Sequence, residues 1–494
     1  MSEQVVGKIV VLEPEQQTRR DVVFERVAGA LMGGAIADAL GWPTEFARKP
    51  EDLHAAGLRY PITEFTAWHK RTGGRFLTRI DNIQPGDYSD DTQLTLSLAR
   101  AIRPDGTVEH EYFAQQELRY WLDYARGAGA TVTAAARNAS RTRSDWRWNY
   151  FRFKRGKHDL DYRGAGANGA AMRMSPVALA NANDPDRAYV EAWKNAAVTH
   201  GHPRAILGAV VFAEALRRLL RGHDQTADEF IADLRRWVRS LRPPSDDPDV
   251  RYWLTRWNEG PEQFDQLWAE YVSEIDSMIG RAIELRSQPL EETYRVLGCF
   301  HPATKGSGTA SVVAALALFL HHGKNFERLA IAGANILGSD TDTIGAMAGS
   351  MCGAWLGYVE IPERWAAIMA DYSYLNRVAE YLTLVSMRQA LDNDLRARVS
   401  SIPPPPMRLL DAMKRQDIQD RRPYWHPLFG TGRVIKAESQ NVGLRQPRGR
   451  VVMATVQFEF GQTCKFSSFL SLKPPSEERP RRPKRKAPQM RLDI

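Results

Sequence analysis

Cysteine is scarce in this 494-residue chain, and its distribution excludes two kinds of protein. Only Cys299, Cys352 and Cys464 occur. Because they are odd in number and far apart, they exclude a disulfide framework and a paired-cysteine metal site. The same pattern fits a reducing compartment, so the expected localisation is cytoplasmic.

Long hydrophobic runs are also missing. The longest apolar run, Val312 to Leu320, is too short to span a bilayer. The first four residues, Met-Ser-Glu-Gln, lack the charged-then-apolar pattern of a secretory signal. Because 43% of the residues are hydrophobic, the chain can still bury a sizeable core. We therefore expect a soluble protein of more than one domain that does not contact a membrane.

Acidic residues are depleted only near the end of the chain. Residues 401–494 carry 19 Lys and Arg against 8 Asp and Glu, a net charge of +11; since the whole chain has +8, residues 1–400 have −3. Four prolines, Pro403 to Pro406, cannot continue a helix and predict a linker over residues 401–422. The basic, low-complexity residues 476–494 predict a disordered arm that attracts phosphate backbones, with a merely solubilising tail as the alternative.

Helical periodicity dominates residues 21–400, after an N-terminal extension of residues 1–20. Apolar residues recur at helical spacing through most of this region, and alternating β patterns are scarce. We expect an all-α domain with loops at residues 47–88, 140–170 and 241–250. Its first helix is rich in Ala and Gly between Phe24 and Leu40, which is typical of close helix contacts or of backbone near a ligand.

The pattern changes to β after residue 423. Three segments that alternate in hydrophobicity are separated by Gly and Pro turns: His426–Ile435, Val451–Phe460 and Thr463–Leu472. They predict a small β-barrel over residues 423–475. The letters HPLFGTGRV resemble the SH3-like or Tudor-like barrels of some helicases and transcription-coupling factors. We expect this module, hinged at the prolines, to recruit nucleic acid or a nucleic-acid-bound protein while the helical domain performs the chemistry.

Two clusters of oxygen ligands each precede a helical run. One reads Ser89-Asp90-Asp91-Thr92, and the other, Gly338 to Thr343, reads GSDTDT. Carboxylates and hydroxyls suit Mg²⁺ or Mn²⁺. One cluster supplies too few ligands, whereas two converging clusters could hold one or two ions. The alternative for each cluster alone is N-capping of the helix, but the presence of both favours a shared metal site.

Four motifs in a fixed order span residues 24–357. They are GAIADALGWPTE at residues 34–45, SDDT at 89–92, GANGAAMR at 166–173 with THGHP at 199–203, and GSDTDTIG at 338–345. Together they resemble the ADP-ribosylglycohydrolase family, which includes the dinitrogenase reductase-activating glycohydrolases and the ADP-ribosyl-acceptor hydrolases. The resemblance implies an α-helical domain with a binuclear Mg²⁺ centre and substrates that are ADP-ribose conjugates.

The resemblance also implies a ligand set, carried over position by position. The metal ligands would be Ser89, Asp90, Asp91, Asp340, Asp342 and Thr343, with Mn²⁺ as an alternative to two Mg²⁺ ions. The family usually has Thr where Ser89 stands, and the hydroxyl is kept. Glu45 matches an acidic residue beside the metals in some members. Glu45, Asp91 and Asp342 are the expected catalytic residues.

The chemistry of these residues agrees with that reading. Cleavage of a ribosyl bond passes through an oxocarbenium-like state and needs an activated water and a proton for the leaving group. Magnesium can orient ribose hydroxyls and acidify a water, while Glu45 or a metal-bound aspartate moves protons. By pattern alone, Glu45 could equally be a solvated loop carboxylate.

Substrate contacts are predicted in the remaining motifs. The glycines of residues 164–169 suit close approach of backbone N–H groups to a pyrophosphate, although such runs are more often flexible turns. Predicted substrate-binding residues are Asn168, Gly169, His200 and Ser339. For His200 and His202, a core or capping role is the alternative. Five aromatic residues could stack on adenine or belong to the core: Trp42, Trp146, Trp148, Tyr150 and Phe151.

Three functions are compatible with these features. The leading one is a Mg²⁺-dependent hydrolase that removes ADP-ribose from a modified protein or nucleic acid. The second is an inactive ADP-ribose-binding or inhibitory module of the same fold, and the third is a different metal-dependent phosphoester hydrolase. The acceptor stays open, because arginine, serine, a nucleobase and a small metabolite all carry the same ADP-ribose half.

Overall fold

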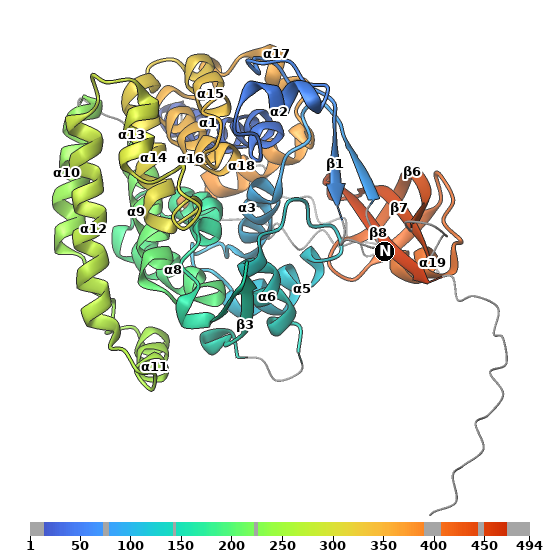
Figure 1. Ribbon diagram of the computed structural model, residues 1–494, viewed down its shortest axis with the longest axis horizontal. Helices are drawn as coiled ribbons and strands as arrows, with labels where there is room; N and C mark the ends of the chain where they lie inside the picture. The colour runs from blue at the N-terminus through green and yellow to red at the C-terminus, as the bar shows by residue number, and fades with distance from the viewer. Residues whose placement is uncertain are drawn as a thin grey trace, which may run out of the picture.

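The protein consists of a helical domain with an antiparallel sheet at its C-terminal end (Figure 1). The computed structural model describes residues 14–72, 79–141, 145–221, 226–389, 407–442 and 449–471. The predicted fold class, a mostly helical domain followed by a small β domain, is confirmed. Within the described residues, no helix is long and apolar enough to cross a membrane.

The helical domain is built mostly of helices, as the periodicity predicts. They are α1 (Pro14–Gly41), α2 (Pro50–Ala55), α3 (Asp90–Ala101), α4 (His110–Tyr112), α5 (Leu118–Trp121), α6 (Ala130–Ala139), α7 (Ser175–Ala180), α8 (Pro185–Thr199), α9 (Pro203–Leu220), α10 (Ala227–Ser240), α11 (Pro248–Trp257), α12 (Phe264–Glu284), α13 (Leu290–Val296), α14 (Gly308–His322), α15 (Phe326–Ala334), α16 (Thr341–Leu356), α17 (Glu363–Ala366) and α18 (Tyr372–Ser386). Short helical turns include η1 (Trp42–Thr44) and η5 (Asn168–Arg173).

The segments expected to be loops contain short elements. Residues 47–88 hold α2 and the hairpin of β1 (Trp68–Thr72) and β2 (Arg79–Ile83), and residues 140–170 hold the hairpin of β3 (Arg152–Arg155) and β4 (His158–Asp161). Helix α11 begins at Pro248, inside the third expected loop. Strands of four or five residues are too short to show a clear alternation, which explains why the sequence pattern did not reveal them.

Helices α1 and α16 are in backbone contact along an antiparallel seam. A Cβ atom added to Gly29 would lie 2.3 Å from the Gly353 carbonyl oxygen, and one added to Gly41 would lie 2.4 Å from the Thr341 carbonyl oxygen. Between these pairs, Gly33 meets Gly349 in the same way. Residues four apart share one helix face, so the predicted small-residue stripe serves helix packing. The seam brings the end of α1 beside the start of α16.

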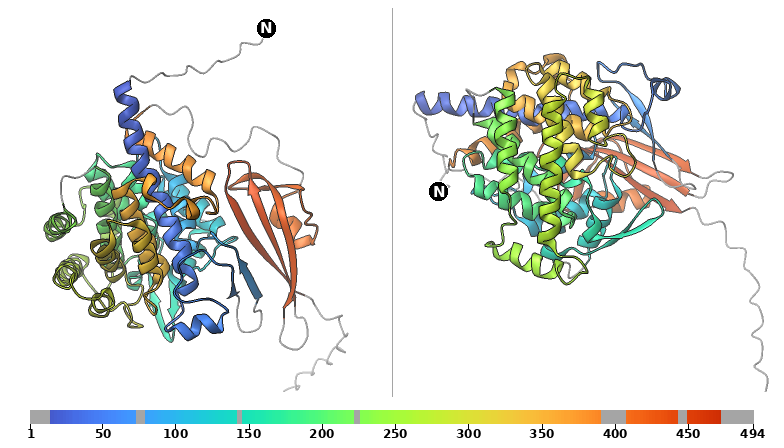
Figure 2. Two further views of the ribbon diagram at one scale, coloured as in Figure 1. Left: turned by 90° about the horizontal axis from the view of Figure 1, so that it is seen from above. Right: turned by 60° about the vertical axis from the view of Figure 1, so that its left-hand side comes forward.

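The C-terminal strands form one curled sheet, a half-barrel (Figure 2). Its order is β5 (Pro423–His426), β6 (Gly430–Val442), β7 (Gly449–Phe458) and β8 (Thr463–Ser471), with every neighbouring pair antiparallel. The register shifts between Val434 and Lys436, an irregularity of the kind that increases strand twist. Identity with an SH3 or Tudor barrel stays a prediction. Helix α19 (Leu409–Arg415) lies within the predicted linker.

The sheet and the helical domain share one core. The rings of Phe429 and Phe466 lie 5.3 and 5.8 Å from the ring of Tyr124 on the helical side. The buried guanidinium of Arg100 on α3 donates to the Gln462 side-chain oxygen at 2.7 Å. This packing differs from the expectation of an independent module on a hinge. The proline segment and the tail of residues 476–494 lie outside the described residues, and the predicted domain boundaries stay predictions.

The seam predicts a strong effect for the smallest possible substitution. Gly353→Ala would place a Cβ atom 1.9 Å from the Gly29 carbonyl oxygen, so the two backbones must separate. We expect a loss of roughly 1–3 kcal/mol in the free energy of unfolding, the usual cost of overpacking. Gly280→Ala on α12 is the matched control, because its Cβ meets only the flexible end of Arg235. Equal denaturation midpoints for both variants would contradict the backbone contact between α1 and α16.

Candidate metal centre and active site

A cavity of about 240 Å³ lies where the predicted motifs meet. Predicted site residues that line it are Glu45, Asp90, Asp91, Asn168, Gly169, His200, Asp340, Asp342 and Thr343. They come from the end of the turn η1, the start of α3, η5, the end of α8 and the start of α16. Two predicted residues, Ser89 and Ser339, do not line it.

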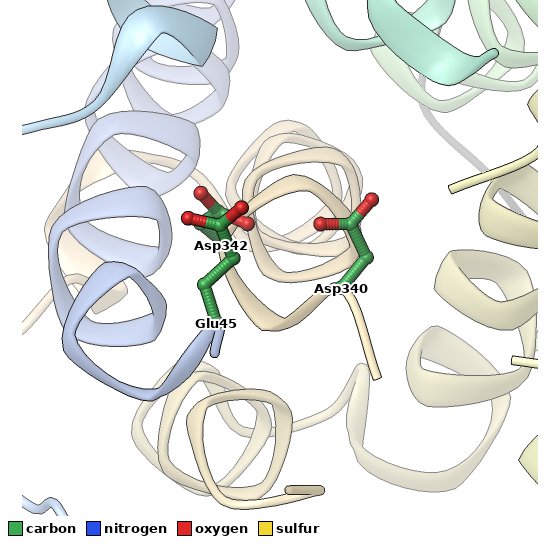
Figure 3. Close-up of side chains that lie close together, drawn as sticks. All are labelled: Glu45, Asp340 and Asp342. Carbon is green, nitrogen blue, oxygen red and sulfur yellow. The ribbon is translucent and has the colours of Figure 1, made fainter. Parts of the chain in front are cut away.

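Three carboxylates form the tightest cluster. Oxygen atoms of Glu45, Asp340 and Asp342 lie within 4.8 Å of one another, and Figure 3 shows the Asp340 carboxylate turned toward the other two. Asp340 is the N-cap residue of α16, yet its side chain makes no capping hydrogen bond. It accepts a hydrogen bond from the Asn168 side-chain nitrogen at 2.6 Å instead. Capping therefore does not account for Asp340.

The second acidic cluster combines capping with a free carboxylate oxygen. The Ser89 hydroxyl accepts from the Asp91 backbone N–H and donates to Asp91 Oδ2, both at 3.2 Å, so its side chain serves the start of α3. Asp91 Oδ1 is buried and has no hydrogen-bond partner among the described residues. Asp90 lies against Gly127, because a Cβ atom added to Gly127 would be 2.9 Å from Asp90 Oδ1. The cavity therefore receives carboxylates from both clusters.

Asp38 fixes the position of the second cluster. It is fully buried in α1 and accepts hydrogen bonds from the backbone N–H groups of Ser89 and Thr92, each at 3.1 Å, and from the Thr92 hydroxyl at 2.5 Å. These contacts attach the start of α3 to α1. Asp38 is thus a partner of the helix start.

Burial makes the negative charges of the cavity costly. It raises the pKa of Glu45 to about 8 and that of Asp90 to about 7, and the charge of Asp340 adds to both shifts. Burial and neighbouring carboxylates raise the pKa values of Asp91 and Asp342 well above the ordinary range. A divalent cation would offset this cost, and all-oxygen donors suit a hard cation. The residues present therefore fit a metal centre.

Two lysines approach the Glu45 turn, and no sequence pattern marks them. The Lys305 ammonium donates to the Glu45 backbone carbonyl at 2.8 Å. The Lys70 ammonium, from β1, lies 3.8 Å from Glu45 Oε2. Both residues lie far from Glu45 in the sequence and outside the four motifs, so only the tertiary structure brings them together.

The predicted substrate-binding residues divide into two groups. His200 faces the cavity with a buried Nε2 that has no hydrogen-bond partner among the described residues, while its Nδ1 lies 2.7 Å from the Thr199 hydroxyl. Burial lowers the pKa of His200 well below its ordinary value, and nearby Arg173 contributes, so the imidazole is neutral. Ser339 is fully buried and donates to the Ile336 carbonyl at 2.7 Å, which makes it part of the turn before α16.

The apolar wall of the cavity comes from residues that the sequence analysis missed. Phe153 and Leu160 line it from the β3–β4 hairpin, and Val132 lines it from α6. Trp42, one of the aromatic candidates for adenine stacking, is instead buried edge-on against Trp68, with ring centroids 5.2 Å apart. No sequence pattern marks Phe153, because its strand β3 has only four residues.

Comparison with known proteins assigns the helical part of the chain. A family model described as ADP-ribosylglycohydrolase matches residues 19–392. The chain belongs to the ADP-ribosylglycohydrolase family. The match contains every residue of the acidic clusters and ends before the C-terminal sheet begins.

Individual relatives are distant but cover most of the chain. The chain is 25% identical over 349 residues to the ADP-ribosyl-[dinitrogen reductase] glycohydrolase of Rhodospirillum rubrum, covering 69% of this chain and 90% of that protein. It is 26% identical over 374 residues to ADP-ribosylhydrolase ARH3 of Bos taurus, covering 73% and 92%. It is 24% identical over 384 residues to ADP-ribosylarginine hydrolase Tri1 of Pseudomonas putida, covering 76% and 81%. A solved chain, titled ADP-ribosylglycohydrolase-related protein complex, matches with a TM-score of 0.48 at 22% identity over 74% of this chain and 100% of its own.

The raised pKa values predict how stability depends on pH and metal. Carboxyl groups with raised folded-state pKa values favour folding below their unfolded pKa of about 4, and this contribution is lost as pH rises through the folded values, about 7 for Asp90 and about 8 for Glu45. In EDTA, we expect the melting temperature to fall between pH 5 and pH 8. Mg²⁺ should raise it more at pH 8 than at pH 5.

The Asp342→Asn variant provides the control for this measurement. Removing one buried carboxylate from the cluster should reduce both the pH-dependent loss and the gain on adding Mg²⁺. A Mg²⁺-induced increase in melting temperature of unchanged size in Asp342→Asn would show that the ion acts elsewhere.

Proposed function

We propose that this protein is a metal-dependent hydrolase that removes ADP-ribose from an ADP-ribosylated protein or nucleic acid. The observation that carries the proposal is the convergence of Glu45 with the carboxylates of two distant acidic clusters in one cavity. Family membership supports ADP-ribose conjugates as the substrate class, and the names of the relatives point in the same direction.

The metal would be held by the carboxylates and one hydroxyl that line the cavity. These residues are Asp90, Asp91, Asp340, Asp342 and Thr343. Two Mg²⁺ ions are the proposed occupants, with Mn²⁺ as the alternative. When bound, such ions orient ribose hydroxyls and acidify a water molecule. Ser89 contributes through α3, because its hydroxyl is engaged with Asp91.

Glu45 is the proposed proton-transfer residue. Its carboxylate is close to Asp342 and Asp340 and reaches the cavity from a turn fixed by Lys305. A carboxyl group that faces the reacting atoms can take up and release a proton, and burial favours the protonated form of Glu45 by raising its pKa. Asp91 and Asp342 complete the catalytic set by orienting the water and the ribose.

The rest of the cavity suits the two halves of ADP-ribose. Helix α6 begins at the cavity with Gly129 as N-cap and without an acidic residue in its first turn, so its first N–H groups can donate hydrogen bonds to a pyrophosphate. Asn168 and Gly169 start η5 at the same cavity. The neutral His200 can hydrogen-bond a ribose hydroxyl or a phosphate oxygen through Nε2. Phe153 provides an apolar surface for the base.

Two other functions use the same cavity. An inactive ADP-ribose-binding or inhibitory module would need no proton-transfer group, and the retention of Glu45 with both clusters argues against it. A metal-dependent phosphoester hydrolase would cleave the pyrophosphate instead of the ribosyl bond. The identity of the product separates all three functions.

The product assay uses ADP-ribosylated arginine, serine, thymidine and guanosine with Mg²⁺. We expect the wild-type protein to release free ADP-ribose from at least one conjugate and EDTA to abolish the release. Asp91→Asn and Asp342→Asn should be inactive. Glu45→Gln should lower the rate by about 10² or more, the usual scale for a lost acid–base group, with ADP-ribose affinity little changed. The exposed acid Glu262 supplies a control, Glu262→Gln, which should retain the wild-type rate.

Each other outcome of this assay identifies a different function. AMP together with an acceptor that still carries phosphoribose would indicate the phosphoester hydrolase. Tight ADP-ribose binding without any product would indicate the binding module.

We also propose that the basic C-terminal tail contacts nucleic acid. Because the sheet shares the core of the helical domain, deleting the sheet would disturb the fold. The deletion that tests the proposal therefore removes only residues 476–494, which are rich in Lys and Arg. This deletion should leave hydrolysis of a small conjugate unchanged and weaken binding to single-stranded DNA or RNA. The lost binding should be the part that falls steeply with salt, as counterion release requires. Equal affinities of the full-length and the truncated protein for the nucleic acid at low salt would contradict the proposal.

A further inference from the structure

Lys70 reaches the acidic centre without a hydrogen bond of its own. Its ammonium lies 3.8 Å from Glu45 Oε2 and 4.8 and 5.0 Å from the ring centroids of Trp42 and Phe46. The nitrogen is buried and has no hydrogen-bond acceptor among the described residues. Because no direct bond fixes this charge, its position depends on the β1–β2 hairpin that carries it.

The C-terminal sheet contacts this hairpin through β2, the strand that pairs with β1. Asp81 stands directly across from Lys70 in the strand register and forms an ion pair with Lys465 of β8. The two side chains of the pair are only 14% and 10% exposed, so little solvent screens their attraction. The Lys465 ammonium also lies 3.4 Å from the Asn82 carbonyl, and the Gln440 side chain of β6 accepts from the Ile80 N–H at 3.3 Å.

These contacts matter because the hairpin is small. An isolated two-stranded hairpin is marginally stable in water, and here each strand has five residues. Figure 2 shows the hairpin beside the C-terminal sheet in both views. The sheet therefore supplies the anchoring that the hairpin lacks by itself.

The same strand, β8, is also connected to the start of the second acidic cluster through Asp371 and Tyr88. The Thr463 N–H at its start donates to Asp371 Oδ1 at 2.8 Å, and the Tyr88 hydroxyl donates to Asp371 Oδ2 at 2.6 Å. Tyr88 directly precedes Ser89 and the start of α3. Asp371 has φ = 58°, a left-handed conformation that is uncommon outside glycine and that its two partners help to maintain.

We propose that the C-terminal sheet positions the active site, with Lys465 and Lys70 as its positioning residues. Lys465 holds the hairpin that sets Lys70 against Glu45, and the start of β8 holds Asp371 and Tyr88 next to the Asp90–Asp91 turn. The matched family region ends at residue 392, so this anchoring comes from the part of the chain beyond it. The catalytic consequence rests on the proposed function, whereas the anchoring of the hairpin does not.

The experiment replaces Lys465 by Met in the full-length protein, which removes the charge and keeps most of the side-chain length. Hydrogen exchange of the β1 and β2 amides should accelerate by about tenfold or more because the hairpin opens locally, while α16 stays protected. The turnover number should fall by about tenfold through misplacement of Glu45, with ADP-ribose affinity little changed. Arg433→Met is the matched control, because Arg433 is exposed on β6 of the same sheet. Lys465→Arg should restore both readouts.

A double-mutant comparison tests whether Lys465 acts through Lys70. Lys70→Met should lower the turnover number by a similar factor, and Lys70→Met with Lys465→Met should lower it little further, since coupled residues are not additive. Additive losses, or unchanged hairpin exchange in Lys465→Met, would overturn the proposal. If no conjugate is hydrolysed by the wild-type protein, faster exchange in Lys465→Met but not in Arg433→Met still supports the anchoring, and only the proposed function fails.

Discussion

The antiparallel seam between α1 and α16 is the constraint on which the candidate site depends. Gly29 and Gly353 mark one end of it, and Gly41 and Thr341 mark the other. Because only small residues allow two helix backbones to touch, the seam fixes both the distance and the register of the helices. Glu45 follows the end of α1, and the GSDTDT cluster begins α16. Their meeting is therefore a consequence of helix packing.

This packing concentrates negative charge where water is largely excluded. The pKa values of Glu45 and Asp90 rise because burial disfavours their ionised forms. Lys70 and Lys305 supply nearby positive charge, and both lower the pKa of Glu45 against that trend. Asp38, deeper in α1, binds the start of α3 through hydrogen bonds. The fold thus holds several buried carboxylates together at the cavity without enough positive charge to balance them. A divalent cation would supply that positive charge.

The C-terminal sheet changes how the domains relate to each other. A hinged module would leave its contact face polar, whereas Phe429 and Phe466 pack on Tyr124 and Arg100 of α3 bonds to Gln462. The sheet is therefore packed into the same core as the helical domain. Any recruiting role moves to the basic tail, while the sheet is placed where it can hold the elements around the cavity.

The sequence alone determined the local features of this protein, because these depend on residues close together in the chain. Helical periodicity, the presence of a helix beside each acidic cluster, and the oxygen-rich chemistry of both clusters could all be read from it. Only the tertiary structure decided which side chains meet. It engaged the Ser89 hydroxyl in a capping hydrogen bond. It also brought Lys70 near Glu45 and Phe153 to the cavity, on hairpins too short to show a pattern. Contacts between distant segments arise from packing and register, which no local pattern encodes.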